Sequence, residues 1–272
     1  MRGFLLLFAL LVISFLSTFV KPRAGLARPD ESVVAKTVDL TGSFEGLDGC
    51  FVLLDVSTGE ILRYRRDRCS TRLSPCSTFK IPNALIGLET GVIPDADHVM
   101  QWDGKRRSRK VTNRDHDLAS AVAQSVVWYF QRLAEGVGLE RMQKLVNSFD
   151  YGNRDLSAGL TEFWLGSSLE ISADEQTEFL RRLHERELPL SRRAMDIVLD
   201  LIVLDRRDDV VFRGKTGSCR GEENDPDLGW FVGSVERADG VKVFAVNVLG
   251  EKAWGTVARR IAERSLRRLG EL

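Results

Sequence analysis

Segments with the residue patterns of β-strands lie near both ends of the chain, and a long stretch with helical patterning separates them. The segments 51–55 and 61–65 are short apolar or alternating runs joined by turn-like residues, which predicts a hairpin. Between residues 78 and 204, apolar residues recur at helical spacing. Three more strand-like segments follow, at 210–215, 229–235 and 241–249. Because strands and helices do not alternate, we predict an α+β fold with one five-stranded antiparallel sheet, flanked by helices and joined to a helical lobe.

The last predicted helix, at 257–269, has an apolar side and many arginines. Ile261, Leu266 and Leu269 would cover the sheet, and the arginines would form a solvated face rather than contact a membrane or a nucleic acid. A cleft between a sheet and a helical lobe is a natural place for a catalytic site. The predicted fold therefore lets side chains from both parts meet in one cleft.

The first 27 residues have the layout of a secretory signal peptide. Arg2 precedes an uncharged apolar run from Gly3 to Val20, and the small-x-small triplet Gly25-Leu26-Ala27 follows. We expect cleavage after Ala27, export to the periplasm or out of the cell, and no stable membrane association afterwards. An uncleaved anchor is the alternative, since the apolar run has about the ~17 residues of a short transmembrane helix. The predicted organisation is a signal peptide at 1–27, an N-terminal segment at 28–48 and one main domain at 49–272.

The charge balance does not favour a nucleic-acid partner. The chain has 39 Lys and Arg against 39 Asp and Glu. Its first 27 residues contain three basic residues and no acidic one, so the part expected to be exported is slightly acidic. General nucleic-acid binding requires a basic domain or stripe. We expect a small-molecule partner, and the sequence does not indicate an oligomeric state.

All four cysteines lie in the part expected to be exported, where disulfides can form. They are Cys50, Cys69, Cys76 and Cys219. Four cysteines allow three pairings, and the sequence does not choose among them. Cys69 and Cys76 bracket a short connection and are a plausible pair, with free buried thiols as the alternative. No Cys-x-x-Cys motif occurs and the three histidines are scattered, so we expect no metal site.

The segment Ser77-Thr78-Phe79-Lys80 contains a candidate nucleophile and its base. A serine and a lysine three residues apart share one face of a helix, so the amine can reach the hydroxyl. Serine is a weak nucleophile until a base takes its proton, and lysine can do so only if burial suppresses its charge. Ser74-Pro75 is a helix-start signal, which places Ser77 where free backbone N–H groups can stabilise an oxyanion. Pro82 predicts a distorted first turn.

A second candidate motif, Lys215-Thr216-Gly217, ends a predicted strand and precedes Ser218. It offers a cation, a hydroxyl and a backbone that a substrate carboxylate and carbonyl can approach closely. Gly214-Lys215-Thr216 also looks like the end of a phosphate-binding loop. That interpretation fails because the required earlier glycine is Asp209 and no helix pattern follows.

Five motifs occur in order along the chain. They are the segment from Pro75 to Val92, Ser125-x-Val127, Tyr151-Gly152-Asn153, Phe163-Trp164-Leu165 and Lys215-Thr216-Gly217. Together they resemble the motifs of the class D serine β-lactamases, the oxacillinase type, and the resemblance extends from about residue 49 to the C-terminus. It implies the fold shared by serine β-lactamases and penicillin-binding transpeptidases. It also implies hydrolysis of the β-lactam ring of penicillin-type antibiotics, which confers resistance.

The resemblance implies catalytic roles for Ser77, Lys80, Ser125 and Lys215. Ser77 would attack the lactam carbonyl to give an acyl-enzyme. Lys80 would react with carbon dioxide to become an N6-carboxylated base for acylation and deacylation, with no other cofactor. This modification needs a neutral amine, so burial must lower the lysine pKa from its usual value of about 10.4. Ser125 would relay a proton to the leaving lactam nitrogen.

Further motif residues would support these steps. Val127 and Trp164 would stabilise the carbamate, Val127 by desolvation and Trp164 also through its indole N–H. The backbone N–H groups of Ser77 and Ser218 would form the oxyanion hole. The implied substrate-binding residues are Tyr151, Thr216, Gly217 and Ser218, with Tyr151 at the margin of the site in a structural or substrate-contacting role.

Two positions depart from the family pattern. The family commonly reads Trp-Leu-Glu-Gly where this chain has Trp164-Leu165-Gly166-Ser167. The family also supplies an arginine for the substrate carboxylate at the start of the last helix, where this chain has Ala258 followed by Arg259. The residue that binds the carboxylate is therefore open at this stage.

Two other functions share the fold. One is a β-lactam sensor that keeps a long-lived acyl adduct, and the other is a penicillin-binding DD-peptidase without efficient deacylation. Such sensors carry membrane spans and a protease-like domain, and neither pattern occurs in this sequence. The Trp164 match and the apolar setting of Lys80 favour the hydrolase, since those peptidases do not rely on a carboxylated lysine.

Overall fold

The computed structural model describes residues 35–207, 209–221 and 225–272. The predicted signal peptide and the first part of the segment 28–48 lie outside the described residues. The described part contains a seven-stranded sheet with the order β1-β3-β2-β7-β6-β5-β4. Its strands are β1 Ala35–Thr37, β2 Asp48–Asp55, β3 Ile61–Tyr64, β4 Val203–Arg207, β5 Val210–Cys219, β6 Asp227–Arg237 and β7 Gly240–Gly250.

The predicted five-stranded antiparallel sheet is wrong in strand number and in direction. The five expected strands are present as β2, β3, β5, β6 and β7, but β1 and β4 extend the two edges of the sheet. β1 pairs with β3 in parallel, so the sheet is mixed. β1 has only three residues, all exposed, and β4 carries the charged run Asp205-Arg206-Arg207. Neither strand shows the apolar alternation by which a strand is recognised, and exposed edge strands have no need of it.

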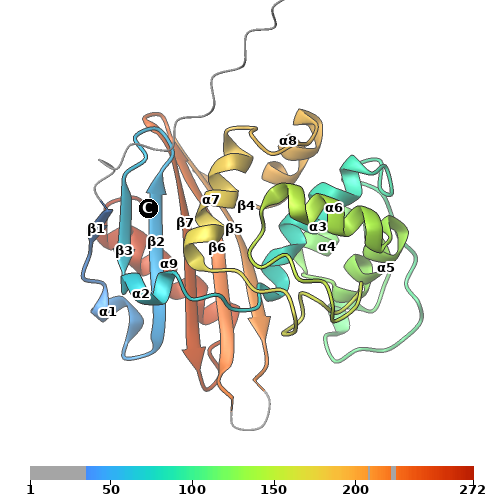
Figure 1. Cartoon of the computed structure of the whole chain (residues 1–272), viewed down its shortest axis with the longest axis horizontal. Coiled ribbons are helices and arrows are strands. Elements are labelled where there is room, and N and C mark those ends of the chain that lie inside the picture. The colour runs from blue at the N-terminus through green and yellow to red at the C-terminus, as the bar shows by residue number, and fades with distance from the viewer. Residues whose placement is uncertain (1–34, 208, 222–224) are drawn as a thin grey trace, which may run out of the picture. The chain divides into compact units, whose positions relative to one another are not determined.

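The helices lie on both faces of the sheet and beside it (Figure 1). They are α1 Thr41–Phe44, α2 Arg66–Cys69, α3 Lys80–Glu89, α4 Leu118–Ala123, α5 Val127–Val137, α6 Leu139–Phe149, α7 Ala173–His184, α8 Arg192–Leu201 and α9 Gly255–Arg268, with the 3-10 helices η1 Cys76–Phe79 and η2 Lys110–Thr112. The predicted helical lobe corresponds to α3, α4, α5, α6 and α8. In the described part of the chain, no helix is both long enough and apolar enough to cross a membrane.

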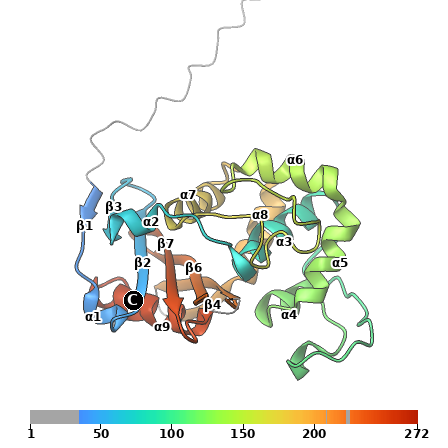
Figure 2. The same ribbon diagram turned by 60° about the horizontal axis from the view of Figure 1, so that its bottom comes forward.

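Alternation along the strands divides the core between the two faces of the sheet. On β6, Trp230 and Val232 belong to the core shared with α7 and the helical lobe, whereas Phe231 and Val235 pack in the core under α9. Figure 2 shows α7 and α9 on opposite sides of the central strands. Because side chains of a strand point alternately to its two faces, consecutive residues of β5 also face different layers. This alternation decides which residues of the Lys215 motif reach the helical lobe.

α7 is fixed against the sheet by its N-terminal cap. The Ser172 hydroxyl accepts a hydrogen bond from the Glu175 backbone N–H, and the Glu175 carboxylate accepts one from the Ser172 N–H. Asp174 in the same turn accepts a hydrogen bond from Arg63 of β3 at 2.7 Å. The cap satisfies backbone donors that the first turn of a helix leaves free. The cap thus stabilises the first turn of α7, and the ion pair of Asp174 with Arg63 ties that turn to the sheet.

Replacing Ser172 by alanine should lower the free energy of unfolding by about 1 kcal/mol, since it removes the capping oxygen. Urea denaturation monitored by circular dichroism measures this change. Ser148→Ala is the matched control, because the exposed Ser148 hydroxyl only donates to the Leu145 carbonyl within α6. Its effect should stay within about 0.5 kcal/mol. Equal losses in the two variants would contradict the role assigned to the cap.

Candidate active site

The candidate nucleophile and base are in direct contact. Ser77 lies in η1, and Lys80 is the first residue of α3. The Lys80 Nζ donates a hydrogen bond to the Ser77 Oγ at 2.8 Å. Ser77 is partly exposed, whereas Lys80 is only 1% exposed. The expected pairing of hydroxyl and amine is therefore present, with the hydroxyl open to solvent and the amine shielded from it.

Burial is the main cause of the altered basicity of Lys80. It holds the pKa of the Lys80 amine well below its usual range, and the positive charges of Lys215 and Arg109 lower it further. The Lys80 Nζ lies 5.5 Å from the centre of the Phe130 ring on α5. Phe130 is fully buried and was not among the predicted site residues. Its place on the apolar side of a helix gave no sign that it faces an amine.

A second lysine and serine meet on the other side of the site. The Lys215 Nζ donates to the Ser125 Oγ at 3.1 Å and to the Thr216 carbonyl at 3.0 Å. Lys215 comes from β5, and Ser125 lies in the short connection between α4 and α5 with a backbone φ of 53°. Burial first, and then the charge of Arg109, lower the pKa of Lys215 to about 7. This lysine can therefore exchange a proton near neutral pH.

β5 approaches the nucleophile turn so closely that only glycine fits at position 217. A Cβ at Gly217 would lie 2.9 Å from the Pro75 carbonyl oxygen and 3.2 Å from the Thr78 nitrogen. Lys215, Gly217 and Cys219 alternate onto this side of β5, since Lys215 contacts Ser125 and Cys219 is bonded to Cys76. Thr216 and Ser218 lie on the opposite side. There the Gly255 N–H at the start of α9 donates to the Ser218 Oγ at 2.9 Å.

Tyr151 lies behind the nucleophile turn rather than at the mouth of the site. It is 1% exposed, and its ring meets the Phe79 ring edge-on with centres 5.6 Å apart. The Tyr151 hydroxyl donates to the Gln176 amide oxygen at 3.2 Å, and the Gln176 amide donates to the Thr78 hydroxyl at 2.9 Å. The burial contradicts the expected substrate contact of Tyr151 and leaves the structural role. Gln176 was not predicted, because no sequence motif marks it.

Trp164 stacks on the other side of Phe79. The two ring centres are 5.7 Å apart, and Trp164 is fully buried. Its indole Nε1 is buried and has no hydrogen-bond partner among the described residues. Val127, the other expected stabilising residue, opens α5 and is partly buried. A buried donor without an acceptor is costly, so this position is suited to an added hydrogen-bond acceptor.

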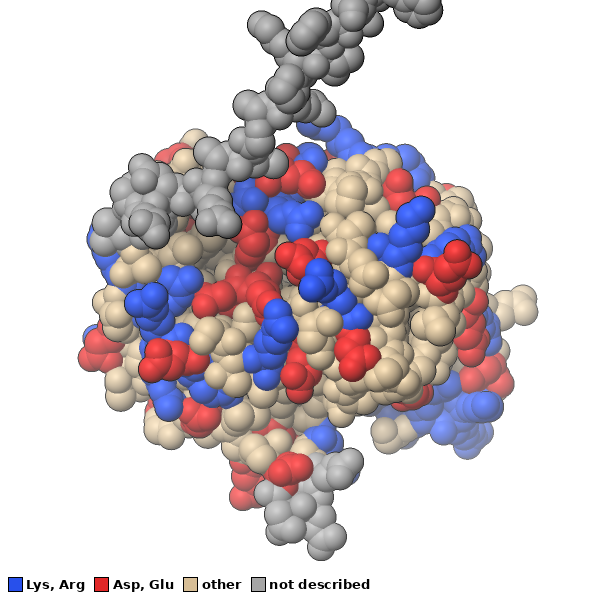
Figure 3. All heavy atoms as spheres, in the orientation of Figure 1, with Lys and Arg blue, Asp and Glu red and all other residues tan. Residues whose placement is uncertain are grey.

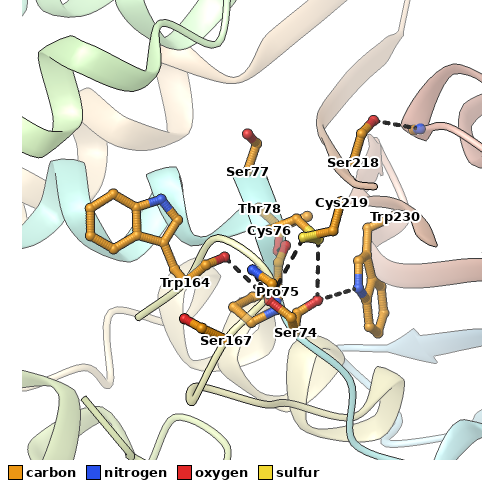
Figure 4. Close-up of a disulfide and its surroundings, with 12 residues drawn as sticks. Ser74, Pro75, Cys76, Ser77, Thr78, Trp164, Ser167, Ser218, Cys219 and Trp230 are labelled. Carbon is orange, nitrogen blue, oxygen red and sulfur yellow. Dashed lines mark hydrogen bonds between the residues drawn. A yellow bond between two sulfur atoms is a disulfide. The ribbon is translucent and has the colours of Figure 1, made fainter. Parts of the chain in front are cut away.

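The disulfide joins Cys76 to Cys219, with Cα atoms 5.7 Å apart (Figure 4). The plausible pairing of Cys69 with Cys76 is therefore wrong, and Cys50 and Cys69 are buried free thiols. The Cys69 thiol lies against the backbone of the β2-β3 hairpin, 3.3 Å from the Tyr64 carbonyl oxygen. Chain proximity favoured Cys69, but the alternation of β5 brings Cys219 to η1.

Neither expected carboxylate-binding position faces the site. Ala258 is fully buried between α9 and the sheet. The Arg259 Nε donates to Glu263 at 2.8 Å, and its guanidinium lies over the Phe231 ring in the layer of α9. Both therefore belong to the face of the sheet opposite the helical lobe. Neither residue therefore reaches the side of the sheet where Lys215 meets Ser125.

Arg109 is a further cation near the two lysines, and no sequence motif marked it. It is exposed and precedes η2, and its charge acts on both Lys80 and Lys215. The loop is held to the site because the Trp128 indole of α5 donates to the Thr112 carbonyl at 2.8 Å. Basic side chains gather at the lower right of Figure 3, where Figure 1 shows the segment between α3 and α4. Among the described residues, no group of three or more His, Cys, Asp or Glu could hold a metal ion.

Comparison with known proteins agrees with this geometry. The penicillin binding protein transpeptidase domain matches residues 49–267. A probable beta-lactamase of Bacillus subtilis, YbxI, is 40% identical over 233 residues, which is 86% of this chain and 85% of that protein. A crystal structure of a class D beta-lactamase from Bacillus subtilis superposes with a TM-score of 0.82 at 39% identity, covering 86% of this chain and 97% of that one.

The chain belongs to the class D β-lactamase family. The C-terminal domain of the Bacillus licheniformis BlaR penicillin receptor is also similar, with a TM-score of 0.84 and 34% identity over 88% of this chain and 97% of that domain. In this class D β-lactamase, Ser77, Lys80, Ser125 and Lys215 converge in one site although β5 and the helical lobe are far apart in sequence.

Replacing the buried amine should stabilise this class D β-lactamase. The folded pKa of Lys80 is lowered, so the folded state disfavours the charged lysine at any pH below the unfolded value of about 10.4. Lys80→Met should therefore raise the free energy of unfolding by about 2 kcal/mol at pH 7 in buffer free of bicarbonate. The difference should shrink as the pH rises towards 10, where the unfolded lysine loses its proton.

Chemical denaturation at several pH values measures this difference. Lys144→Met is the control, because Lys144 is exposed on α6 and its replacement should change stability by less than about 0.5 kcal/mol. A Lys80→Met variant less stable than the wild type at pH 7 would show that the folded protein does not disfavour the charged amine.

Proposed function

We propose that this chain hydrolyses β-lactam antibiotics through an acyl-enzyme on Ser77. The observation that carries the proposal is the 2.8 Å contact between the Lys80 amine and the Ser77 hydroxyl, in a site where the amine is buried and the hydroxyl is accessible. Membership of the class D family supports the same reaction. Ser77 attacks the lactam carbonyl, the carbon–nitrogen bond of the ring breaks, and water later releases the penicilloate-type acid.

Lys80 acts as the base after it reacts with carbon dioxide. Its lowered pKa keeps the amine neutral, which the reaction with carbon dioxide requires, and a proton is released as the nitrogen–carbon bond forms. The carboxylated side chain carries an anionic oxygen that can accept a proton. The unpartnered Trp164 Nε1 fits this group, since it supplies a buried donor for one of its oxygens. Phe130 shields the same position from water, since its ring centre lies 5.5 Å from the Lys80 Nζ.

Ser125 and Lys215 deliver a proton to the lactam nitrogen as it leaves. Their side chains are hydrogen-bonded at 3.1 Å, and the pKa of Lys215 is about 7, so this pair can hold a proton and deliver it near neutral pH. The backbone N–H groups of Ser77 and Ser218 serve as the oxyanion hole. The close approach of β5 to η1 at Gly217 supports this role, because it brings the two segments within van der Waals contact.

The substrate carboxylate binds to Lys215 and Arg109, and the expected contribution of Thr216 falls away because Thr216 lies against Gly255 at the start of α9. Arg109 replaces the arginine that other members of the family place on the last helix, since Ala258 and Arg259 face away from the site. Positive potential from Arg109 already acts on both lysines of the site. An anionic substrate entering beside η2 is therefore attracted to it.

A β-lactam sensor is the second candidate, favoured by the similarity to the BlaR penicillin receptor. A sensor and a hydrolase share acylation and differ in deacylation. The buried amine and the unpartnered Trp164 donor support a base that remains available for deacylation. Export to an oxidising compartment, as the N-terminal sequence predicts, is supported by the Cys76–Cys219 disulfide.

Purified residues 28–272 should turn over a chromogenic cephalosporin, and the steady rate should rise on addition of bicarbonate. Lys80→Ala should reduce kcat by about 10³-fold and accumulate an acylated protein, because deacylation loses its base. Absorbance measures turnover and mass spectrometry measures the adduct. One stoichiometric acylation of the wild type without turnover would point to the sensor, and unchanged turnover of Lys80→Ala would exclude Lys80 as the base.

Trp164→Phe should raise the bicarbonate concentration needed for half-maximal activity about tenfold, as expected from one lost charge-assisted hydrogen bond. Bicarbonate titration of kcat, together with the ¹³C NMR signal of the labelled lysine carbamate, measures the effect. Trp102→Phe is the control, because the Trp102 indole donates to the Lys105 carbonyl at 3.2 Å within an exposed loop. Equal bicarbonate requirements for Trp164→Phe and the wild type would contradict a contact between Trp164 and the carbamate.

A further inference from the structure

The Cys76–Cys219 disulfide lies between the two segments that hold the proposed oxyanion-hole donors. Cys76 directly precedes Ser77, and Cys219 directly follows Ser218. The bond therefore connects the nucleophile turn to β5 at a point adjacent to both backbone N–H groups. Figure 4 shows the disulfide between the labelled Ser77 and Ser218. The two cysteines are 143 residues apart in sequence, and the link joins η1 to the end of β5.

The backbone on the Cys76 side of the bond has an unusual conformation. Cys76 has a φ of 50°, a left-handed conformation that residues with a Cβ adopt rarely. Such a conformation persists where the surroundings determine it. Cys76 is fully buried, and its disulfide is the covalent part of those surroundings. Opening the bond removes a constraint from the residue that sets the direction of Ser77.

The same bond supports the loop that carries Trp164. A Cβ at Gly166 would lie 3.7 Å from the Cys219 Sγ, so the Gly166 backbone rests against the disulfide. Ser74 ties this loop to the nucleophile turn, because its hydroxyl accepts from the Gly166 N–H at 3.0 Å and donates to the Trp164 carbonyl at 3.3 Å. Gly166, which stands where the family commonly has a glutamate, therefore lies beside the disulfide.

We propose that the Cys76–Cys219 disulfide is a redox-sensitive positioning element that holds the two oxyanion-hole donors in register and so sets the rate of acylation. The inference rests on the function proposed above, because it assigns the disulfide a part in that reaction. Cys76 and Cys219 are positioning residues, since they act through Ser77 and Ser218. The activity of the enzyme then depends on an oxidising environment.

A dithiol reductant can open the bond from the side of Cys219. Cys219 is partly exposed, whereas Cys76 is fully buried, so we expect the thiolate to attack at Cys219. Attack forms a mixed disulfide at Cys219 and releases the Cys76 thiolate, which takes up a proton. The second thiol of the reductant then releases Cys219 as a thiol. Two electrons and two protons pass from the dithiol to the protein, and the reductant becomes a disulfide.

The test compares the full chain, exported and oxidised, with the same protein reduced by dithiothreitol and then reoxidised by oxidised glutathione. Reduction should lower kcat and the acylation rate at least tenfold with less than a threefold change in KM, since loss of one oxyanion donor costs ~10²–10³ in kcat. Reoxidation should restore both rates. The bicarbonate concentration needed for half-maximal activity is then measured on the reduced enzyme. An unchanged concentration indicates that reduction displaces the oxyanion-hole donors, whereas a raised one indicates loss of the lysine modification.

Two variants complete the test. Cys76→Ala/Cys219→Ala should show the lowered kcat without reductant and no further response to it. Cys69→Ala is the control, because it removes a buried cysteine outside the disulfide and should keep the full response to reductant. If the double variant does not fold, the reduction and reoxidation of the wild type decide the question alone.

Hydrogen exchange provides a readout independent of turnover. Reduction should increase amide exchange in 74–80 and 214–220 while β7 stays protected. If the oxidised protein does not hydrolyse β-lactams, the proposed function fails, and the exchange of these two segments still decides whether the disulfide positions them. Unchanged kcat after complete reduction of an active enzyme, or unchanged exchange in both segments, would overturn the inference.

Discussion

The removal of the Lys80 amine from water is the constraint on which the active site depends. A charged ammonium is costly to bury, so the amine must be neutral or modified to remain 1% exposed. Phe130 on α5 contributes to this shielding, since its ring centre lies 5.5 Å from the Lys80 Nζ although the two residues are far apart in sequence. The helical lobe therefore serves two purposes, since it completes the core and shields the Lys80 amine from water.

The contact between β5 and η1 is the second constraint on the geometry of the site. Gly217 lets the two backbones approach to a distance that any side chain would prevent, and the Cys76–Cys219 bond joins them covalently beside it. Lys215 reaches Ser125 from the same side of the strand. The alternation of side chains along β5 thus directs Lys215, Gly217 and Cys219 towards the site. Thr216 and Ser218 face α9 instead.

Much of this arrangement was predictable because it follows from local patterns. The five motifs contain both pairs of residues that meet in the site, Ser77 with Lys80 and Ser125 with Lys215, and the strand segments around the helical stretch indicated the layers. The edge strands β1 and β4 were missed because edge strands need no apolar alternation. Gln176, Phe130 and Arg109 were missed for another reason, since each acts through a neighbour that lies far away in the chain.

The sequence alone determined the family, the presence of a sheet with helices around it, and the pairing of Ser77 with Lys80, because these depend on residue types at fixed short spacings. Only the tertiary structure decided which cysteines pair, that Tyr151 is buried behind Phe79, and that Arg259 faces away from the site. These features depend on which faces of strands and helices meet across the core. The spacing of residues along the chain does not show which faces meet. Those contacts form only when β5, η1 and the helical lobe pack together.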